Sequence, residues 1–246
     1  MALDPQLNSR SLFIRAAPRS RRPPIREFVR AALSRDFVHA TELALVFLAQ
    51  TESRTRLFSD LFHAAQQHIE ERWHGGEATV SDEYAVYLAI EAALAALPDP
   101  LLRDAPPGAP TILLGTLAPE EHDLGLRLLA ASFADVSWNV DVRVGVGGAD
   151  LIEHAVRDKR RVVGISATFL SRRARAELAA TVNALKAAGM LVLAGGAAFS
   201  RSPALGQQLG VDLVATDSRF AVLYVNRLVR RPEGSRRLLS EGRARP

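Results

Sequence analysis

The second half of the chain alternates between short apolar runs and longer amphipathic segments, and this alternation constrains the fold most. Runs of strand length are each followed by a segment whose apolar residues have helical spacing. Parallel strands need a crossover connection, usually a helix, so the pattern predicts a doubly wound parallel sheet. The expected strands are 111–117, 140–145, 161–167, 190–195 and 212–216, and the expected helices are 122–134, 149–158, 171–188, 202–209 and 220–229.

The first half, from Ile25 to Leu97, has the spacing of amphipathic helices throughout. Gly75-Gly76 ends the third apolar stripe, and Thr79 begins the fourth as a helix N-cap. Four helices with short connections predict an up-down bundle. Because crossovers are right-handed, the expected fold is α + α/β: a four-helix bundle followed by a flavodoxin-like five-stranded parallel sheet in the order 2-1-3-4-5.

The charge of the chain is uneven, since both ends are rich in arginine. Such ends fit weak, non-specific contact with nucleic acid, contact with an acidic protein, or simple solvation. There is no apolar run of the roughly 18 residues that a membrane span needs, and Asp4 argues against a signal peptide. With no cysteine either, we expect a cytoplasmic protein without thiolate metal sites or disulfides. The expected divisions are a basic flexible arm (1–24), the helical bundle (25–98), a Pro-rich linker (99–110), the sheet domain (111–229) and a basic tail (230–246).

Polar residues and glycines follow three of the expected strands at their carboxyl ends. In an open parallel sheet, ligands bind at this edge, near the point where the strand order reverses. Each feature alone is ordinary, because loop histidines, Ser or Thr caps and glycine turns are common at strand ends. Together they predict a ligand site, with Glu120 as a carboxylate partner that fixes the tautomer of His122. The residues are Glu120, His122 and Gly125 after the first strand, Ser166 and Thr168 after the third, and Gly195 and Gly196 after the fourth.

These residues resemble the motifs of the cobalamin-binding domain family, Asp-x-His-x-x-Gly, Ser-x-Leu or Ser-x-Thr, and Gly-Gly. The resemblance implies that His122 is the lower ligand of cobalt, in place of the cofactor's own base. It also implies that the nucleotide tail lies in a slot beside Ser166 and the glycines Gly195 and Gly196. The chain departs from the family at Glu120, which is one methylene longer than the usual aspartate.

The helical half resembles the capping bundle of CarH-type light sensors, which carry Trp-x9-Glu-His. This chain has Trp73, nine residues, and then Glu83-Tyr84. The resemblance implies that Trp73 and Glu83 cover the upper face of the cofactor. The spacing to Glu83 favours this role for Trp73 over the alternative, a core aromatic at the end of a helix. Tyr84 stands where those sensors have a second histidine, which binds cobalt after photolysis. Which group of this chain binds cobalt in its place is left open. Nearby candidates, each also an ordinary surface histidine, are His63, His68 and His74.

The resemblance favours a stand-alone cobalamin sensor that is not itself an enzyme. We expect adenosylcobalamin, with hydroxo- and methylcobalamin as alternatives, and either light or the cobalamin level as the signal. No MerR-type DNA-binding domain is expected, so the output would pass to a transcription factor or another protein, as in AerR-like antirepressors. The alternatives are a corrinoid shuttle subunit of a methyltransferase system and a haem-binding sensor on the same fold. Neither a nucleophile–base pair nor a P-loop is evident in the sequence.

Overall fold

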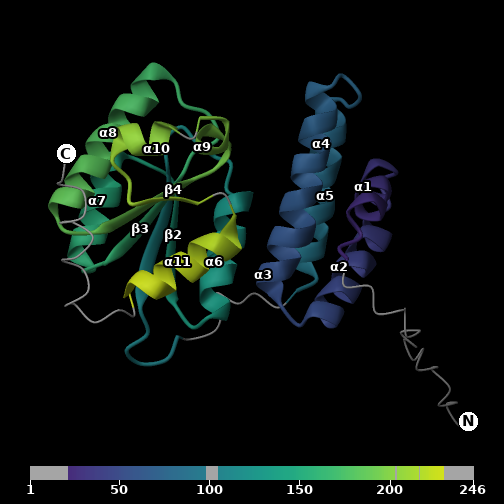
Figure 1. The fold of residues 1–246 in the computed structure, drawn as a ribbon, viewed down its shortest axis with the longest axis horizontal. Helices are drawn as coiled ribbons and strands as arrows, with labels where there is room; N and C mark the ends of the chain where they lie inside the picture. Colours follow the sequence, from purple (N-terminus) through teal and green to yellow (C-terminus); the bar gives the residue numbers. More distant parts are fainter. Residues whose placement is uncertain (1–21, 98–104, 203, 216, 230–246) are drawn as a thin grey trace, which may run out of the picture.

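A computed structural model describes residues 22–97, 105–202, 204–215 and 217–229. Within that part, a helical region is followed by a domain built on a parallel sheet, and the two lie side by side (Figure 1). The fold class expected from the sequence is therefore confirmed. Most of the basic arm, all of the basic tail and part of the linker lie outside the described residues. Among the helices that are described, none is both long and apolar enough to cross a membrane.

The sheet has its five strands in the order β2-β1-β3-β4-β5, and every neighbouring pair is parallel. This is the order predicted from right-handed crossovers. β2 is added on one side of β1, whereas β3, β4 and β5 are added on the other side. β1 and β3 therefore flank the point where the strand order reverses and where a doubly wound sheet binds its ligands. The strands are β1 (Thr111–Leu117), β2 (Asn139–Val146), β3 (Val162–Ser166), β4 (Leu191–Gly195) and β5 (Leu213–Ala215).

Helices cover both faces of the sheet, and the side chains of β1 alternate between them. Ile112 and Leu114 join one apolar core, whereas Leu113 and Leu117 join the other. A strand buried on both faces is what an uninterrupted apolar run predicts. The first face carries α6 (Leu124–Asp135) and α11 (Ser218–Val229), and the second carries α7 (Gly148–Arg157), α8 (Arg172–Ala187), α9 (Ala197–Arg201) and α10 (Ala204–Leu209).

The structure differs from the sequence prediction after β4, where a short helix, α9, precedes α10. Ser202 follows α9 and has non-helical backbone angles (φ −136°, ψ 78°). The residue before a proline is pushed out of the helical region, and proline has no N–H to donate, so Ser202-Pro203 interrupts the helical pattern.

The N-terminal helices form four rods when three consecutive helical segments are taken as one. Asp36 caps the second rod, Ser53 caps the third, and Thr79 and Asp82 form a capping box on the fourth. Seven residues of the third rod are π-helical, a form that is rare and frequent at functional sites. The segments are α1 (Ile25–Leu33), α2 (Phe37–Thr51), α3 (Arg54–Arg56), η1 (Leu57–His63), α4 (Ala64–His74) and α5 (Val80–Ala95).

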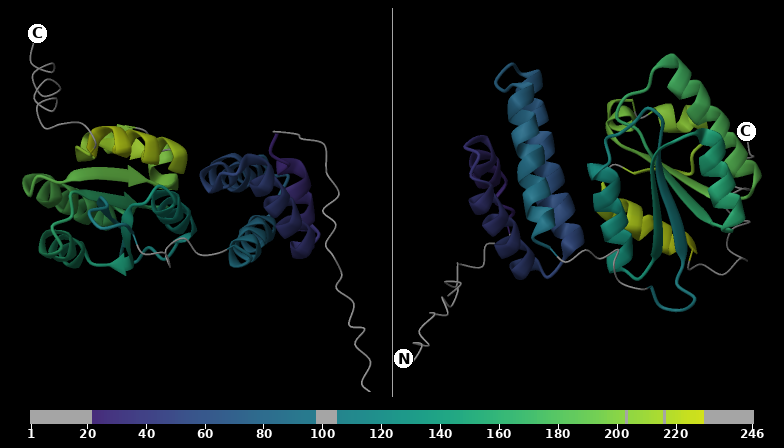
Figure 2. Two further views of the ribbon diagram at one scale, coloured as in Figure 1. Left: turned by 90° about the horizontal axis from the view of Figure 1, so that it is seen from below. Right: turned by 180° about the vertical axis from the view of Figure 1, so that it is seen from behind.

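The bundle lies beside the sheet domain in both views of Figure 2 and packs on it through α6. This helix is apolar on two sides. Leu124 and Leu128 belong to the core of the bundle, whereas Leu126 and Phe133 belong to the core between α6 and the sheet. One helix thus serves two cores. Polar contacts between the two halves include the bidentate pair Arg127–Glu91 (2.8 and 3.2 Å), the ion pairs Arg201–Glu70 (2.9 Å) and Arg54–Asp135 (3.7 Å), and the hydroxyl contact Ser59–Ser218 (3.3 Å).

We expect Phe62→Ala to lower the free energy of unfolding of the bundle by about 3–5 kcal/mol, because it removes a buried ring from a packed core. Phe62 is fully buried, and its ring centroid lies 5.7 Å from that of Phe28 and 6.0 Å from that of Phe58. Urea denaturation followed by circular dichroism measures the change. The control is Phe169→Ala, at a ring 77% exposed, for which a change within about 0.5 kcal/mol is expected. Equal effects of the two substitutions would contradict the packing described for Phe62.

Candidate functional site

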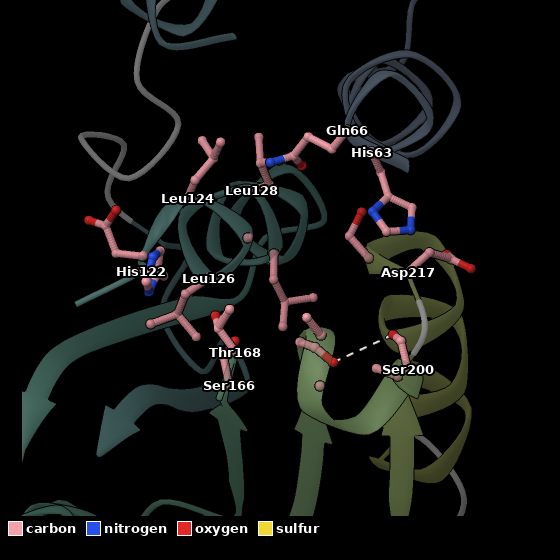
Figure 3. Close-up of a pocket in the computed structure, with 18 of the residues that line it drawn as sticks. His63, Gln66, His122, Leu124, Leu126, Leu128, Ser166, Thr168, Ser200 and Asp217 are labelled. Carbon is pink, nitrogen blue, oxygen red and sulfur yellow. Dashed lines mark hydrogen bonds between the residues drawn. The ribbon is translucent and has the colours of Figure 1, made fainter. Parts of the chain in front are cut away.

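A cleft of about 770 Å³ lies between the carboxyl ends of the strands and the helical bundle (Figure 3). Its floor is formed by the ends of β3 and β4, one side by the β1–α6 loop and the first turns of α6, and the bundle side by η1, α4 and α5. This is the edge of the sheet at which the sequence predicts a ligand site. The volume is in the range of ligand-binding clefts.

The β1–α6 loop, which carries His122, is anchored by a buried hydroxyl. Thr116, the penultimate residue of β1, is fully buried. Its Oγ1 donates to the carbonyl of Glu120 (2.9 Å) and accepts from the N–H of Gly145 on β2 (2.8 Å). The hydroxyl therefore ties the loop to the neighbouring strand, and it fixes the position from which the Glu120 side chain starts.

The Glu120 carboxylate joins two loops of the rim. Its Oε1 lies 2.5 Å from Nδ1 of His122 and accepts from the His122 backbone N–H (3.1 Å). Its Oε2 accepts from the backbone N–H of Thr168 (2.7 Å), with that of Phe169 farther away at 3.4 Å. Because a carboxylate only accepts, Nδ1 of His122 carries the proton. In a neutral ring, Nε2 is then left with a lone pair. Glu120 thus reaches both loops despite the departure from aspartate.

Glu120 is held in its ionised form by these contacts. Burial alone would raise the pKa of its carboxyl group, but the N–H of Thr168 and the two N–H groups of His122 outweigh it, and the pKa lies below its usual value. The Glu120 side chain is only 11% exposed, whereas that of His122 is 79% exposed. The pair therefore combines a fixed carboxylate with an imidazole that a ligand can reach.

Ser166 and Thr168 line the cleft, as do Gly125, Gly195 and Gly196. Within the described residues, neither the Ser166 nor the Thr168 hydroxyl forms a hydrogen bond, so both are available to a ligand. A Cβ added at Gly125 would meet no atom within 4 Å. The strand-end residues expected from the sequence therefore meet at one cleft, except for Glu120, which contacts His122 and the backbone of Thr168 but does not line the cleft.

Gly196 is required by the backbone itself. Its φ is +91°, a region that favours glycine, and an added Cβ would lie 2.5 Å from the carbonyl oxygen of Ala167. Ala167 also donates to Gly195 (3.0 Å) and accepts from Ala198 (3.1 Å). The Gly-Gly pair therefore lets the β3 and β4 loops come close enough to form one floor.

The bundle contributes some, but not all, of the residues expected from the sequence. Glu83 and Tyr84 line the cleft from α5, and the Tyr84 ring stacks on that of Tyr87 (centroids 5.8 Å apart). Trp73 does not line the cleft; it is 39% exposed in the last turn of α4, with its ring edge-to-face against His74. It lies on the same helical stripe as Glu70, but one turn farther on, beyond the described contacts of α4 with the sheet domain.

Of the three histidines considered as substitutes at position 84, only His63 lines the cleft. His74 is exposed, and its Nδ1 lies 2.8 Å from the carbonyl of Glu70. His68 is half-buried but is not part of the lining.

Sequence reasoning missed several residues of the site. The helical period in α5 could have placed Tyr87 with Tyr84, since the two are three residues apart. Thr116 had no signal in the sequence beyond a polar residue inside an apolar run. Asp217 and Ser200 line the cleft from segments after β5 and β4, and nothing in their local sequence marks them.

We expect Glu120→Ala to lower the free energy of unfolding by about 1.5–3 kcal/mol at pH 7, since it removes hydrogen bonds to a charged, nearly buried acceptor. Because the pKa of Glu120 is lowered in the folded state, this contribution is complete above the unfolded value of about 4.3 and is lost as the pH falls through the lower folded value. Urea denaturation at several pH values from 7 to 3 measures the free energy of unfolding of the wild type and of Glu120→Ala. The difference between the two should become smaller as the pH falls. Glu121→Ala, at an exposed neighbour, is the control. A difference that does not change with pH would exclude the charge as its cause.

Comparison with known proteins gives one family match, which covers residues 110–222 and is described as a B12 binding domain. No curated protein matches the chain. The monomethylamine corrinoid protein of Methanosarcina barkeri has the same fold, with a TM-score of 0.67 at 16% identity over 82% of this chain and 96% of that one.

Two further solved structures are less similar. A cobalamin-binding protein from Desulfitobacterium hafniense DCB-2 has a TM-score of 0.44 at 20% identity, over 82% of this chain and 97% of that one. The methanol:cobalamin methyltransferase complex of Methanosarcina barkeri has a TM-score of 0.45 at 12% identity, over 83% and 79%. The family match spans the whole sheet and every strand-end residue described above, so the similarity to the B12 binding domain family lies in the sheet domain.

Proposed function

We propose that the chain is a sensory protein that binds cobalamin in the cleft, with Nε2 of His122 as the lower ligand of cobalt. The observation that carries the proposal is the Glu120 carboxylate, which accepts from His122 and from the backbone of Thr168. A metal-binding histidine commonly gives its other N–H to a carboxylate, which sets its tautomer and raises its basicity. His122 has that arrangement while its ring is exposed at the rim of the cleft.

The residues present fit the chemistry of such a cofactor. A corrin ring brings four equatorial nitrogens of its own, so the protein needs to supply only one imidazole below the metal. The free hydroxyls of Ser166 and Thr168 and the glycine floor at Gly195-Gly196 offer hydrogen bonds and close backbone approach to a flat ligand. These residues would hold the lower side of the cofactor.

The bundle supports a sensory role, because it forms one side of the same cleft. Glu83 and Tyr84 reach the cleft from α5, and the bundle shares a core with α6, whose first turn follows His122. Adenosylcobalamin supplies a cobalt–carbon bond that light can break. In this proposal, the chain performs no reaction of its own. The output passes from the cytoplasmic protein to a transcription factor or another protein, and the basic ends make weak, non-specific contacts with nucleic acid.

A second candidate is a corrinoid shuttle with a methyltransferase as its partner. The corrinoid protein of Methanosarcina barkeri supports it, since its fold matches this chain across both the bundle and the sheet domain. Fold similarity at 16% identity does not distinguish a shuttle from a sensor. A haem sensor is the third possibility, and the absorption spectrum of the loaded protein separates it from both.

We expect protein loaded with adenosylcobalamin in the dark to change its absorption spectrum under green light and, at the same time, its sedimentation coefficient. The change in sedimentation would show that the bundle responds to the state of the cofactor. Protein loaded with hydroxocobalamin and illuminated in the same way is the control. A spectral change without any change in sedimentation, together with methyl transfer from bound methylcobalamin to a corrinoid-dependent methyltransferase, would favour the shuttle.

We expect His122→Ala to raise the dissociation constant for cobalamin by at least about 10–100-fold, the loss typical of even an indirect partner of a metal. The bound fraction should show the spectrum of cobalamin ligated by its own base. Because His122 is an exposed loop residue, the free energy of unfolding should fall by no more than the loss of its one side-chain hydrogen bond to Glu120, about 0.5–1.5 kcal/mol. His39→Ala, at an exposed histidine on α2, is the matched control. Unchanged affinity and an unchanged spectrum in His122→Ala would refute the assignment.

A further inference from the structure

One end of the cleft, away from His122, gathers polar side chains that belong to none of the motifs (Figure 3). We name it the polar end, and define it by His63, Gln66, Ser200 and Asp217. His63 is the last residue of the π-helical segment η1, and Asp217 directly precedes α11. The polar end is therefore made jointly by the bundle and the sheet domain.

The side chains of the polar end have hydrogen-bonding capacity to spare. Within the described residues, neither the His63 ring nor the Gln66 amide forms a hydrogen bond. One carboxylate oxygen of Asp217 accepts from the backbone N–H of Phe220 (2.7 Å), and the other accepts from none of the described residues. Ser200 makes only a long contact to the carbonyl of Gly196 (3.4 Å). His63, Gln66 and Asp217 are half-buried, whereas Ser200 is exposed. Buried polar groups usually have partners, so the three half-buried side chains indicate a ligand with polar substituents.

The charge of the polar end limits what that ligand can be. Burial lowers the pKa of His63, against the opposing pull of Asp217 and Glu70, so its ring is neutral at pH 7. A neutral imidazole offers one donor and one acceptor. Glu70 is paired with Arg201 (2.9 Å), whereas the Asp217 carboxylate has no cationic partner among the described residues. The polar end therefore suits a neutral group that both donates and accepts, and it disfavours an anion.

We infer, on the basis of the proposed function, that the polar end recognises a carboxamide on the edge of the corrin ring. The corrin edge of cobalamin carries carboxamides, whose N–H groups match Asp217 and whose carbonyls match a donor from Gln66 or His63. The edge of haem carries carboxylates, which Asp217 would repel. The polar end thus selects corrinoids over haem, and an intact carboxamide over the acid formed from it by hydrolysis.

The test compares the full chain's affinity for hydroxocobalamin with its affinity for the b-, d- and e-monocarboxylic acids of hydroxocobalamin, each with one carboxamide replaced by a carboxylate. At pH 7 we expect at least one acid to bind roughly tenfold more weakly, since like charges in an interface are strongly unfavourable. In Asp217→Asn this discrimination should fall to within about threefold, because the charge that repels the acid has been removed.

Asp217→Asn removes the charge but keeps the cap of α11, because asparagine is as good an N-cap as aspartate. The matched control is Asp36→Asn, which changes the same kind of cap on α2, where Asp36 accepts from the N–H of His39 (3.0 Å). The control should discriminate as the wild type does. Haemin is a second anionic probe, and Asp217→Asn should bind it more tightly than the wild type does.

The inference fails if the wild type binds all three acids as tightly as hydroxocobalamin, or if the discrimination persists in Asp217→Asn. Neither result contradicts the proposed function, provided that the wild type binds hydroxocobalamin and that His122→Ala binds it more weakly. If the wild type binds no hydroxocobalamin, or if His122→Ala binds it unchanged, the proposed function itself fails.

Discussion

The site depends on one carboxylate that bridges two loops of the rim. β1 and β3 are neighbours in the sheet, so the loops that follow them leave the same edge side by side. Glu120 comes from the first loop, orients His122 within it, and accepts the backbone N–H of Thr168 from the second. A buried acceptor with donors on both sides holds the two loops at a fixed separation. The Glu120 carboxylate makes the contact to the second loop through the backbone N–H of Thr168.

The cleft has two ends with different chemistry, and they are built in different ways. The end at His122 comes from strand-end loops alone, where Thr116 and the Gly-Gly pair set the backbone. The polar end needs both halves of the molecule, because His63 is in the bundle and Asp217 is in the sheet domain. A ligand that spans the cleft therefore contacts both halves of the molecule, and its binding depends on how the two halves are placed relative to each other.

The fold and the strand-end residues could be predicted from the sequence because their signals are local. Alternating apolar runs specify the strands, crossover handedness limits the strand order, and residues at the ends of neighbouring strands must meet. The residues on the bundle side of the cleft were harder to predict. Whether a helical residue faces the cleft depends on the rotation of its helix and on how far along the helix the contact with the sheet domain extends. Trp73 lies on the same helical stripe as the cleft residue Glu70, but one turn beyond the end of the cleft. The π-helical segment changes the number of residues per turn, so helical periodicity does not predict the direction of His63. Asp217 and Ser200 reach the cleft only through tertiary packing, which no short stretch of sequence encodes.

The linker between the bundle and the sheet domain suggests a place to divide the chain, but α6 crosses that division. A fragment that began after the linker would present Leu124 and Leu128 to water, at a cost of about 1.5–3 kcal/mol for each side chain. The bundle left behind would lack part of its own core, and its exposed apolar strip would favour self-association. The smallest portable unit is therefore the bundle together with a sheet domain whose first helix is apolar on both sides. Gene fusions that recombine such bundles with other sheet domains would have to carry that helix along or recreate its outer face.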